Sequence, residues 1–203
     1  MKKLIIFAAV FGLLAGGIGA SAQTENLPEP GILPDSPFYL LTRFSEGIGM
    51  LFTFGDTAKA GKHLERAEKR LAEANALADQ NKEKGLDKAM SLYQEHLNKA
   101  LQKAEQAGNE DVIARVAEAT SKHLAILEDV LERVPEQAQD AIERAMTASQ
   151  RGQEAALDAL SEQNPTRADE MRQRFQRDLP EEADRVPEDT TPEDAVPEID
   201  ARP

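Results

Sequence analysis

The chain of 203 residues contains no cysteine and no tryptophan, and aromatic residues make up only 4% of it. Without cysteine it has no disulfide, no thiolate metal site, no cysteine nucleophile and no lipid attachment through a cysteine. The sequence also lacks a glycine-rich phosphate loop and a Ser–His–Asp arrangement at a strand-to-helix elbow. We therefore expect no enzymatic activity, no cofactor and no small-molecule substrate.

Positive charge is scarce as well, since 24 Lys and Arg residues face 37 Asp and Glu residues for a formal net charge of −13. Nucleic acids are bound mainly through basic surface, so this balance argues against a nucleic-acid partner. Residues 180–203 hold nine acidic side chains against two arginines, with a proline every five to seven residues. Because this segment has almost nothing to bury, we expect a disordered acidic tail.

The first residues have the pattern of a signal peptide. Lys2 and Lys3 precede an apolar run, residues 4–18, and Ala20-Ser21-Ala22 fits a cleavage site. The run is shorter than the roughly 20 apolar residues that a spanning helix needs. We therefore predict a signal peptide at residues 1–22, cleaved after Ala22, and export to a periplasm, the cell envelope or the medium. A retained anchor is the alternative.

Apolar residues recur at steps of three and four from residue 56 to residue 163, and no stretch alternates with period two. Gly85, Gly108-Asn109 and Pro135 divide this region into four amphipathic runs. The pattern predicts an all-α fold, in which residues 56–163 form an up-and-down helical bundle or a chain of helical hairpins. A long coiled coil is the alternative. A short basic helix at residues 164–179 is expected to cap the bundle or to stay mobile.

Five of the seven aromatic residues that follow the signal peptide lie between Phe38 and Phe54. Residues 23–55 are therefore interpreted as a linker and an aromatic helix, with Asp35 or Ser36 as its N-cap and a bend or break at its two glycines. Since aromatic side chains bury the most area, we expect this helix to cap the core of the bundle or to form an interaction surface. The residues assigned to this role are Phe38, Tyr39, Arg43, Phe44, Phe52 and Phe54.

The same stretch resembles a family of exported helical proteins of unknown function, marked by an LP(G/D)(S/D)P(F/L)Y box followed by charged amphipathic helices. The box is residues 33–39, the following FTF segment is residues 52–54, and the charged helix contains residues 67–74. Thr42 stands where a lysine is common. The resemblance covers roughly residues 30–107. It implies export and helices, and it implies no activity.

The three histidines, His63, His96 and His123, each directly precede a leucine of a helical seam. With the turn between the second and third helices near Asn109, His96 and His123 are expected at the same height, whereas His63 is expected about 12 Å from His96 along the axis. Two imidazoles with a carboxylate, Glu95 or Glu118, suit Zn²⁺, Cu²⁺ or Ni²⁺. Histidines at a seam edge are more often half-buried spacers, so His96 and His123 are only weak metal candidates.

Two non-catalytic functions remain. The first is protein–protein interaction in the cell envelope, with an unknown partner or a second copy of the chain. The second is membrane-surface binding through residues 38–54. An interfacial helix usually has a lysine-rich polar face, and this segment offers only Arg43 against Glu46, so the sequence favours a protein partner. A metal-binding envelope protein is a third possibility.

Overall fold

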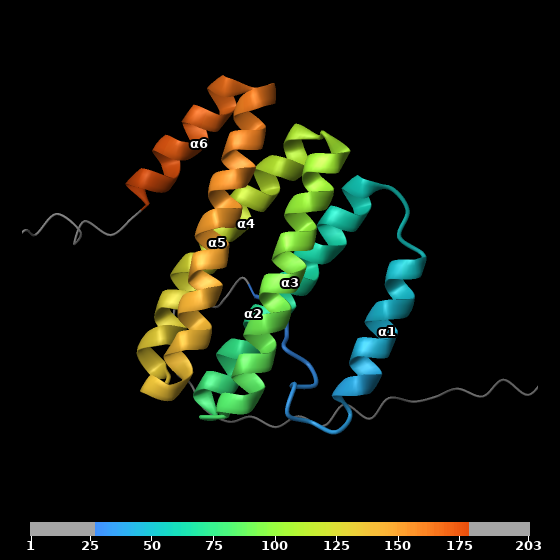
Figure 1. The fold of residues 1–203 in the computed structure, drawn as a ribbon, viewed down its shortest axis with the longest axis vertical. Helices are drawn as coiled ribbons and strands as arrows, with labels where there is room; N and C mark the ends of the chain where they lie inside the picture. The colour runs from blue at the N-terminus through green and yellow to red at the C-terminus, as the bar shows by residue number, and fades with distance from the viewer. Residues whose placement is uncertain (1–26, 179–203) are drawn as a thin grey trace, which may run out of the picture.

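The computed structural model describes residues 27–178 (Figure 1). The predicted signal peptide and acidic tail lie outside these residues. Within them the regular structure consists of six helices and no strand, which confirms the all-α class. The helices are α1 (Tyr39–Leu51), α2 (Asp56–Asp79), α3 (Glu83–Ala107), α4 (Glu110–Arg133), α5 (Glu136–Gln163) and α6 (Pro165–Arg177).

Helices α2 to α5 form an up-and-down bundle made of two hairpins, α2/α3 and α4/α5 (Figure 1). Helix α2 packs against α3 and α4, and α5 also packs against α3 and α4. Helices α3 and α4 therefore lie at opposite corners of the bundle, although they are consecutive in the chain. This arrangement confirms the predicted bundle and replaces the coiled-coil alternative.

Local chemistry fixes the turns between these helices. Gly108 ends α3 with a positive φ of 57°, a conformation that costs glycine little. The side chain of Asn109 then caps α4 by accepting hydrogen bonds from the amides of Asp111 (3.0 Å) and Val112 (3.2 Å). Pro135 occupies the N-cap of α5. These are the glycine, asparagine and proline residues from which the sequence predicted the helix boundaries.

Gly85 has a different role from the predicted one, because the turn before α3 lies at residues 80–82 and Gly85 is inside the helix. A Cβ atom at Gly85 would lie 2.8 Å from a methyl group of Leu77 on α2. The glycine therefore permits the close approach of α2 and α3 next to their turn.

The core consists of two apolar clusters stacked along the bundle axis, separated by a layer that contains buried polar side chains. In this layer the Tyr93 hydroxyl lies 3.0 Å from Nδ1 of His123 and 2.5 Å from Oγ of Ser149. The Thr120 hydroxyl donates to backbone carbonyls of its own helix. The side chains of Tyr93, Thr120, His123 and Ser149 thus each have a hydrogen-bond partner, as burial requires.

Helix α6 folds back from the end of α5 and packs against it at one end of the bundle (Figure 1). Asn164 caps it by accepting a hydrogen bond from the amide of Arg167 (3.1 Å), and Ala168 and Met171 are buried in one of the two core clusters. The short basic helix is therefore a cap of the bundle, one of the two alternatives the sequence left open.

Helix α1 begins later than predicted, at Tyr39, and has no side-chain cap. The two predicted capping residues bond elsewhere: the Asp35 carboxylate pairs with Nζ of Lys82 (2.7 Å), and the Ser36 hydroxyl accepts from the amide of Phe38 (3.3 Å). The helix also runs continuously to Leu51, so the predicted break at its glycines does not occur. A cost of about 1 kcal/mol per glycine is too small to end a helix that its side chains hold in place.

Candidate functional site

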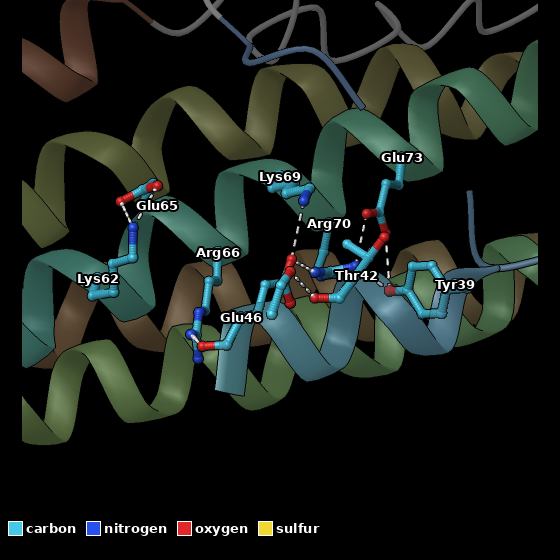
Figure 2. Close-up of polar contacts among 10 residues, drawn as sticks. Tyr39, Thr42, Glu46, Lys62, Glu65, Arg66, Lys69, Arg70 and Glu73 are labelled. Atoms are coloured by element: carbon cyan, nitrogen blue, oxygen red, sulfur yellow. Dashed lines mark hydrogen bonds and ion pairs between the residues drawn. The ribbon is translucent and has the colours of Figure 1, made fainter. Parts of the chain in front are cut away.

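Helix α1 lies beside α2 and turns its polar face toward the bundle (Figure 2). The Glu46 carboxylate forms ion pairs with Arg70 and with Nζ of Lys69, the latter at 3.0 Å. The backbone carbonyl of Glu46 accepts a hydrogen bond from Arg66. Burial by itself would raise the pKa of Glu46, but the cationic groups of Arg70 and Lys69 hold it below its ordinary value. Polar contacts therefore attach α1 to α2.

The deepest part of this attachment is a buried group of three side chains, Tyr39, Arg70 and Glu73 (Figure 2). Nη1 of Arg70 donates to both carboxylate oxygens of Glu73 at 2.7 Å and also to the Tyr39 hydroxyl, which donates to Glu73 at 3.2 Å. Burial raises the pKa of Glu73 and, together with the Glu73 charge, the pKa of the Tyr39 hydroxyl. A buried charge is tolerated only when it is paired in this way.

The opposite face of α1 is apolar and exposed. Among the described residues, every large apolar side chain that is exposed lies between Ile32 and Phe54. The set consists of Ile32, Phe38, Leu40, Leu41, Phe44, Ile48, Leu51, Phe52 and Phe54. We call the α1 members of this set, together with Phe52 and Phe54, the outer face of α1.

The prediction that the aromatic segment caps the core is wrong for its phenylalanines. Phe38, Phe44, Phe52 and Phe54 are 63–79% exposed, and Tyr39 alone is buried. The physical reason lies on α2, where the buried guanidinium of Arg70 needs polar partners. Tyr39 and Glu46 supply them, so the polar face of α1 packs inward and its apolar face is left outside.

The predicted pairing of His96 with His123 is also wrong. Nδ1 of His96 lies 3.3 Å from Nδ1 of His63, while His123 contacts Tyr93 in the polar layer. Helices α2 and α3 form a hairpin, and His63 and His96 are at similar distances from its turn, so the expected separation of about 12 Å was wrong as well. His96 and His123 are apart because α3 and α4 occupy opposite corners of the bundle.

The histidines are held neutral in this fold. Burial, followed by the charge of nearby Arg66, lowers the pKa of His63 to about 4. The pKa of His96 is lowered to about 4 by burial and then by His63 and Arg66, and burial lowers that of His123 to about 4. Over residues 27–178 there is no group of three His, Asp or Glu side chains placed to hold a metal ion.

The two adjacent histidines lie in a cleft of about 460 Å³ between α1 and the α2/α3 hairpin. We call it the α1 cleft. Its lining includes four basic side chains and two acidic ones, together with the two imidazoles; the charged residues are Arg43, Arg66, Lys99, Lys103, Glu46 and Glu95. Of the residues that the sequence assigned to interaction, Arg43 is the one that lines this cleft. The sequence offered no signal for the cleft, because its residues come from three helices.

A protein-family model, described as a domain of unknown function (DUF5667), matches residues 31–137. No curated protein and no solved structure matches the chain. The matched region contains α1 to α4 and ends at the start of α5. It thus includes the outer face of α1, the α1 cleft and the attachment of α1 to α2. None of the helices in the part of the chain described by the structure has the length and apolarity to cross a membrane.

Proposed function

Since the chain belongs to the DUF5667 family of unknown function, we propose its role from its surface: it is a non-catalytic exported protein that binds a membrane surface through the outer face of α1. Export is supported by the signal-peptide pattern of residues 1–22. The observation that carries the binding role is the gathering of all exposed large apolar side chains of the described residues on one segment. Apolar patches of this kind on a soluble surface mark binding sites.

The chemistry of the outer face favours lipid over a protein partner. The polar side chains Ser45 and Thr53 of this segment already have partners, because Ser45 donates to the carbonyl of Thr42 (2.8 Å) and Thr53 donates to the carbonyl of Gly49 (2.9 Å). Tyrosine and arginine are residues that usually anchor protein interfaces. In this segment Tyr39 is buried against the bundle, and Arg43 lines the α1 cleft. The outer face therefore offers apolar contact and almost no hydrogen bonding.

The absence of a lysine-rich face on α1 was the reason to favour a protein partner, and the fold removes that reason. An interfacial helix needs a hydrated side opposite its apolar side. In this protein the polar side of α1 is attached to the bundle, and the bundle itself supplies the hydrated surface. Burial of one Phe or Leu side chain contributes roughly 1.5–3 kcal/mol, so a few inserted side chains suffice for reversible binding.

The test is co-sedimentation of the mature chain, residues 23–203, with phosphatidylcholine vesicles. This form lacks the apolar run at residues 4–18, which would bind lipid by itself. We expect the wild type to sediment with vesicles, and the variant Phe44→Ala with Phe54→Ala to bind at least tenfold more weakly, since about 1.4 kcal/mol of lost binding is one factor of ten. Phe175→Ala removes a half-buried phenylalanine of α6, away from the outer face of α1; it is the control and should bind vesicles like the wild type.

The melting temperature of the double variant should stay unchanged, because both phenylalanines are exposed. A wild type that remains in the supernatant, or a double variant that binds as well as the wild type, would contradict the membrane role. If the wild type does not bind vesicles but binds a protein that the double variant does not bind, the outer face is a binding site for a protein partner.

A further inference from the structure

Two arginines of the α1 cleft lack an acidic partner among the described residues. Arg66 is 8% exposed, and its Nε has no hydrogen-bond partner within residues 27–178. The hydrogen bond that its Nη2 donates goes to the backbone carbonyl of Glu46. Nη1 of Arg43 is also buried, and it has no partner in the part of the chain that the structure describes. A buried guanidinium without an ion-pair partner costs folding free energy. In agreement with this, burial lowers the pKa of Arg66.

The acidic side chains around the cleft are already paired with other cations. The Glu46 carboxylate binds Lys69 and Arg70, that of Glu95 binds Lys99 (2.5 Å), and Asp56 binds Lys103 (2.9 Å). Arg43 and Arg66 therefore remain as an excess of positive charge in a chain whose net charge is −13. The local charge is opposite in sign to that of the whole molecule.

His96 adds a third buried group to the same cleft. It is 4% exposed, and its Nε2 has no partner among the residues described by the structure, while its Nδ1 faces His63. Of two neutral imidazoles in contact through Nδ1, one donates and the other accepts. When His63 is the donor, Nε2 of His96 carries the proton and becomes a hydrogen-bond donor in the cleft.

We propose that the α1 cleft binds a phosphate group, held by Arg43, Arg66 and Nε2 of His96. A guanidinium fork matches the oxygens of phosphate, and charge-assisted hydrogen bonds of this kind are the strong ones. The cleft, at about 460 Å³, also leaves room for an organic group esterified to the phosphate. The shared chemistry fits a free phosphate compound as well as the headgroup of a phospholipid.

A metal cation is the competing occupant, because two imidazole nitrogens face each other at 3.3 Å. The surrounding charge opposes it: Arg66, Lys99 and Lys103 lower the pKa of His63, while the single carboxylate of Glu95 raises it. A field that disfavours a proton on the imidazole disfavours Zn²⁺ as well. The same field attracts an anion. The phosphate proposal does not depend on the membrane role, since Arg43 and Glu46 line the cleft from the face of α1 opposite to the outer face.

The experiment is calorimetric titration of the mature chain, near neutral pH in a phosphate-free buffer, with inorganic phosphate and with soluble short-chain phosphatidic acid. We expect saturable binding to the wild type and at least a tenfold loss of affinity in Arg43→Gln. Arg43 is the variant of choice because no hydrogen bond from it attaches α1 to α2, so the fold should persist, as a circular dichroism melt will show. Arg144→Gln, which removes an exposed arginine of α5, is the matched control and should bind like the wild type.

Tighter binding of phosphatidic acid than of inorganic phosphate would support the proposal with a lipid headgroup as the source, and equal or weaker binding would support it with a free phosphate compound. Absence of saturable binding to either probe, or equal losses in Arg43→Gln and Arg144→Gln, would overturn it. Heat with Zn²⁺ and none with phosphate would overturn it in favour of a cation at the two histidines. The Phe44→Ala, Phe54→Ala variant should keep its phosphate affinity, which separates failure of this proposal from failure of membrane binding.

Discussion

Acidification from about pH 7 to about pH 4.5 should destabilise the bundle, because the fold keeps His123 neutral. This side chain is 2% exposed, in the polar layer between the two apolar clusters, and its Nδ1 lies 3.0 Å from the Tyr93 hydroxyl. Burial lowers its pKa from 6.5 to about 4. In the unfolded chain the same imidazole is solvated and titrates near its ordinary pKa.

The sign and size of the effect follow from these two pKa values. Above about pH 6.5 His123 is neutral in the folded and in the unfolded chain, and its contribution to the free energy of unfolding is fully present. Below it the unfolded chain takes up a proton that the folded chain does not accept until about pH 4. The free energy of unfolding should therefore fall by about 1.4 kcal/mol per pH unit for this residue, and by about 3 kcal/mol in total.

The measurement is urea unfolding, followed by circular dichroism, of the wild type and His123→Gln at several pH values between about 7.5 and 4.5. The variant is expected to be less stable near neutral pH, since it changes a packed layer, but its stability should depend less steeply on pH, by about 1.4 kcal/mol per unit. Carboxylates contribute equally to both curves, including Glu73, whose raised pKa acts with the opposite sign. Parallel curves for the two proteins would refute the reasoning.

Three further changes test the packing by urea or thermal unfolding. Arg70→Met should lower the free energy of unfolding by about 3–5 kcal/mol, because it leaves the buried Glu73 carboxylate without its cation. Arg70→Met combined with Glu73→Leu should lower it less, since no buried charge is left unpaired. An equal or larger loss in the double variant would contradict this. Gly152→Ala should raise the free energy of unfolding by up to about 1 kcal/mol, since the new Cβ would lie in ordinary contact, 3.5 Å from Thr120. A lower melting temperature would show that the site is too tight for a methyl group. Asn164→Ala should cost about 1 kcal/mol by removing the N-cap of α6, and an unchanged stability would show that the cap contributes nothing.

The sequence by itself determined the helices of the bundle. Steps of three and four placed helical residues from Asp56 to Gln163, and the structure begins α2 and ends α5 at these two residues. Asn109 and Pro135 marked turns because capping and proline geometry depend on a few neighbouring residues only. The prediction that Asp35 caps α1 failed because it depended on a distant residue: the Asp35 carboxylate is bound by Lys82, 47 positions further along the chain.

Tertiary structure alone decided which faces meet. The sequence could not show that consecutive helices α3 and α4 lie across a diagonal, so it paired His96 with His123, whereas the α2/α3 hairpin pairs His96 with His63. It also could not show that α2 buries Arg70. Aromatic composition predicted that the segment containing Phe44 packs inward, but a buried guanidinium without polar partners costs more than a few phenylalanines left in water. Helix α1 therefore turns its polar face to the bundle and its apolar face to the solvent.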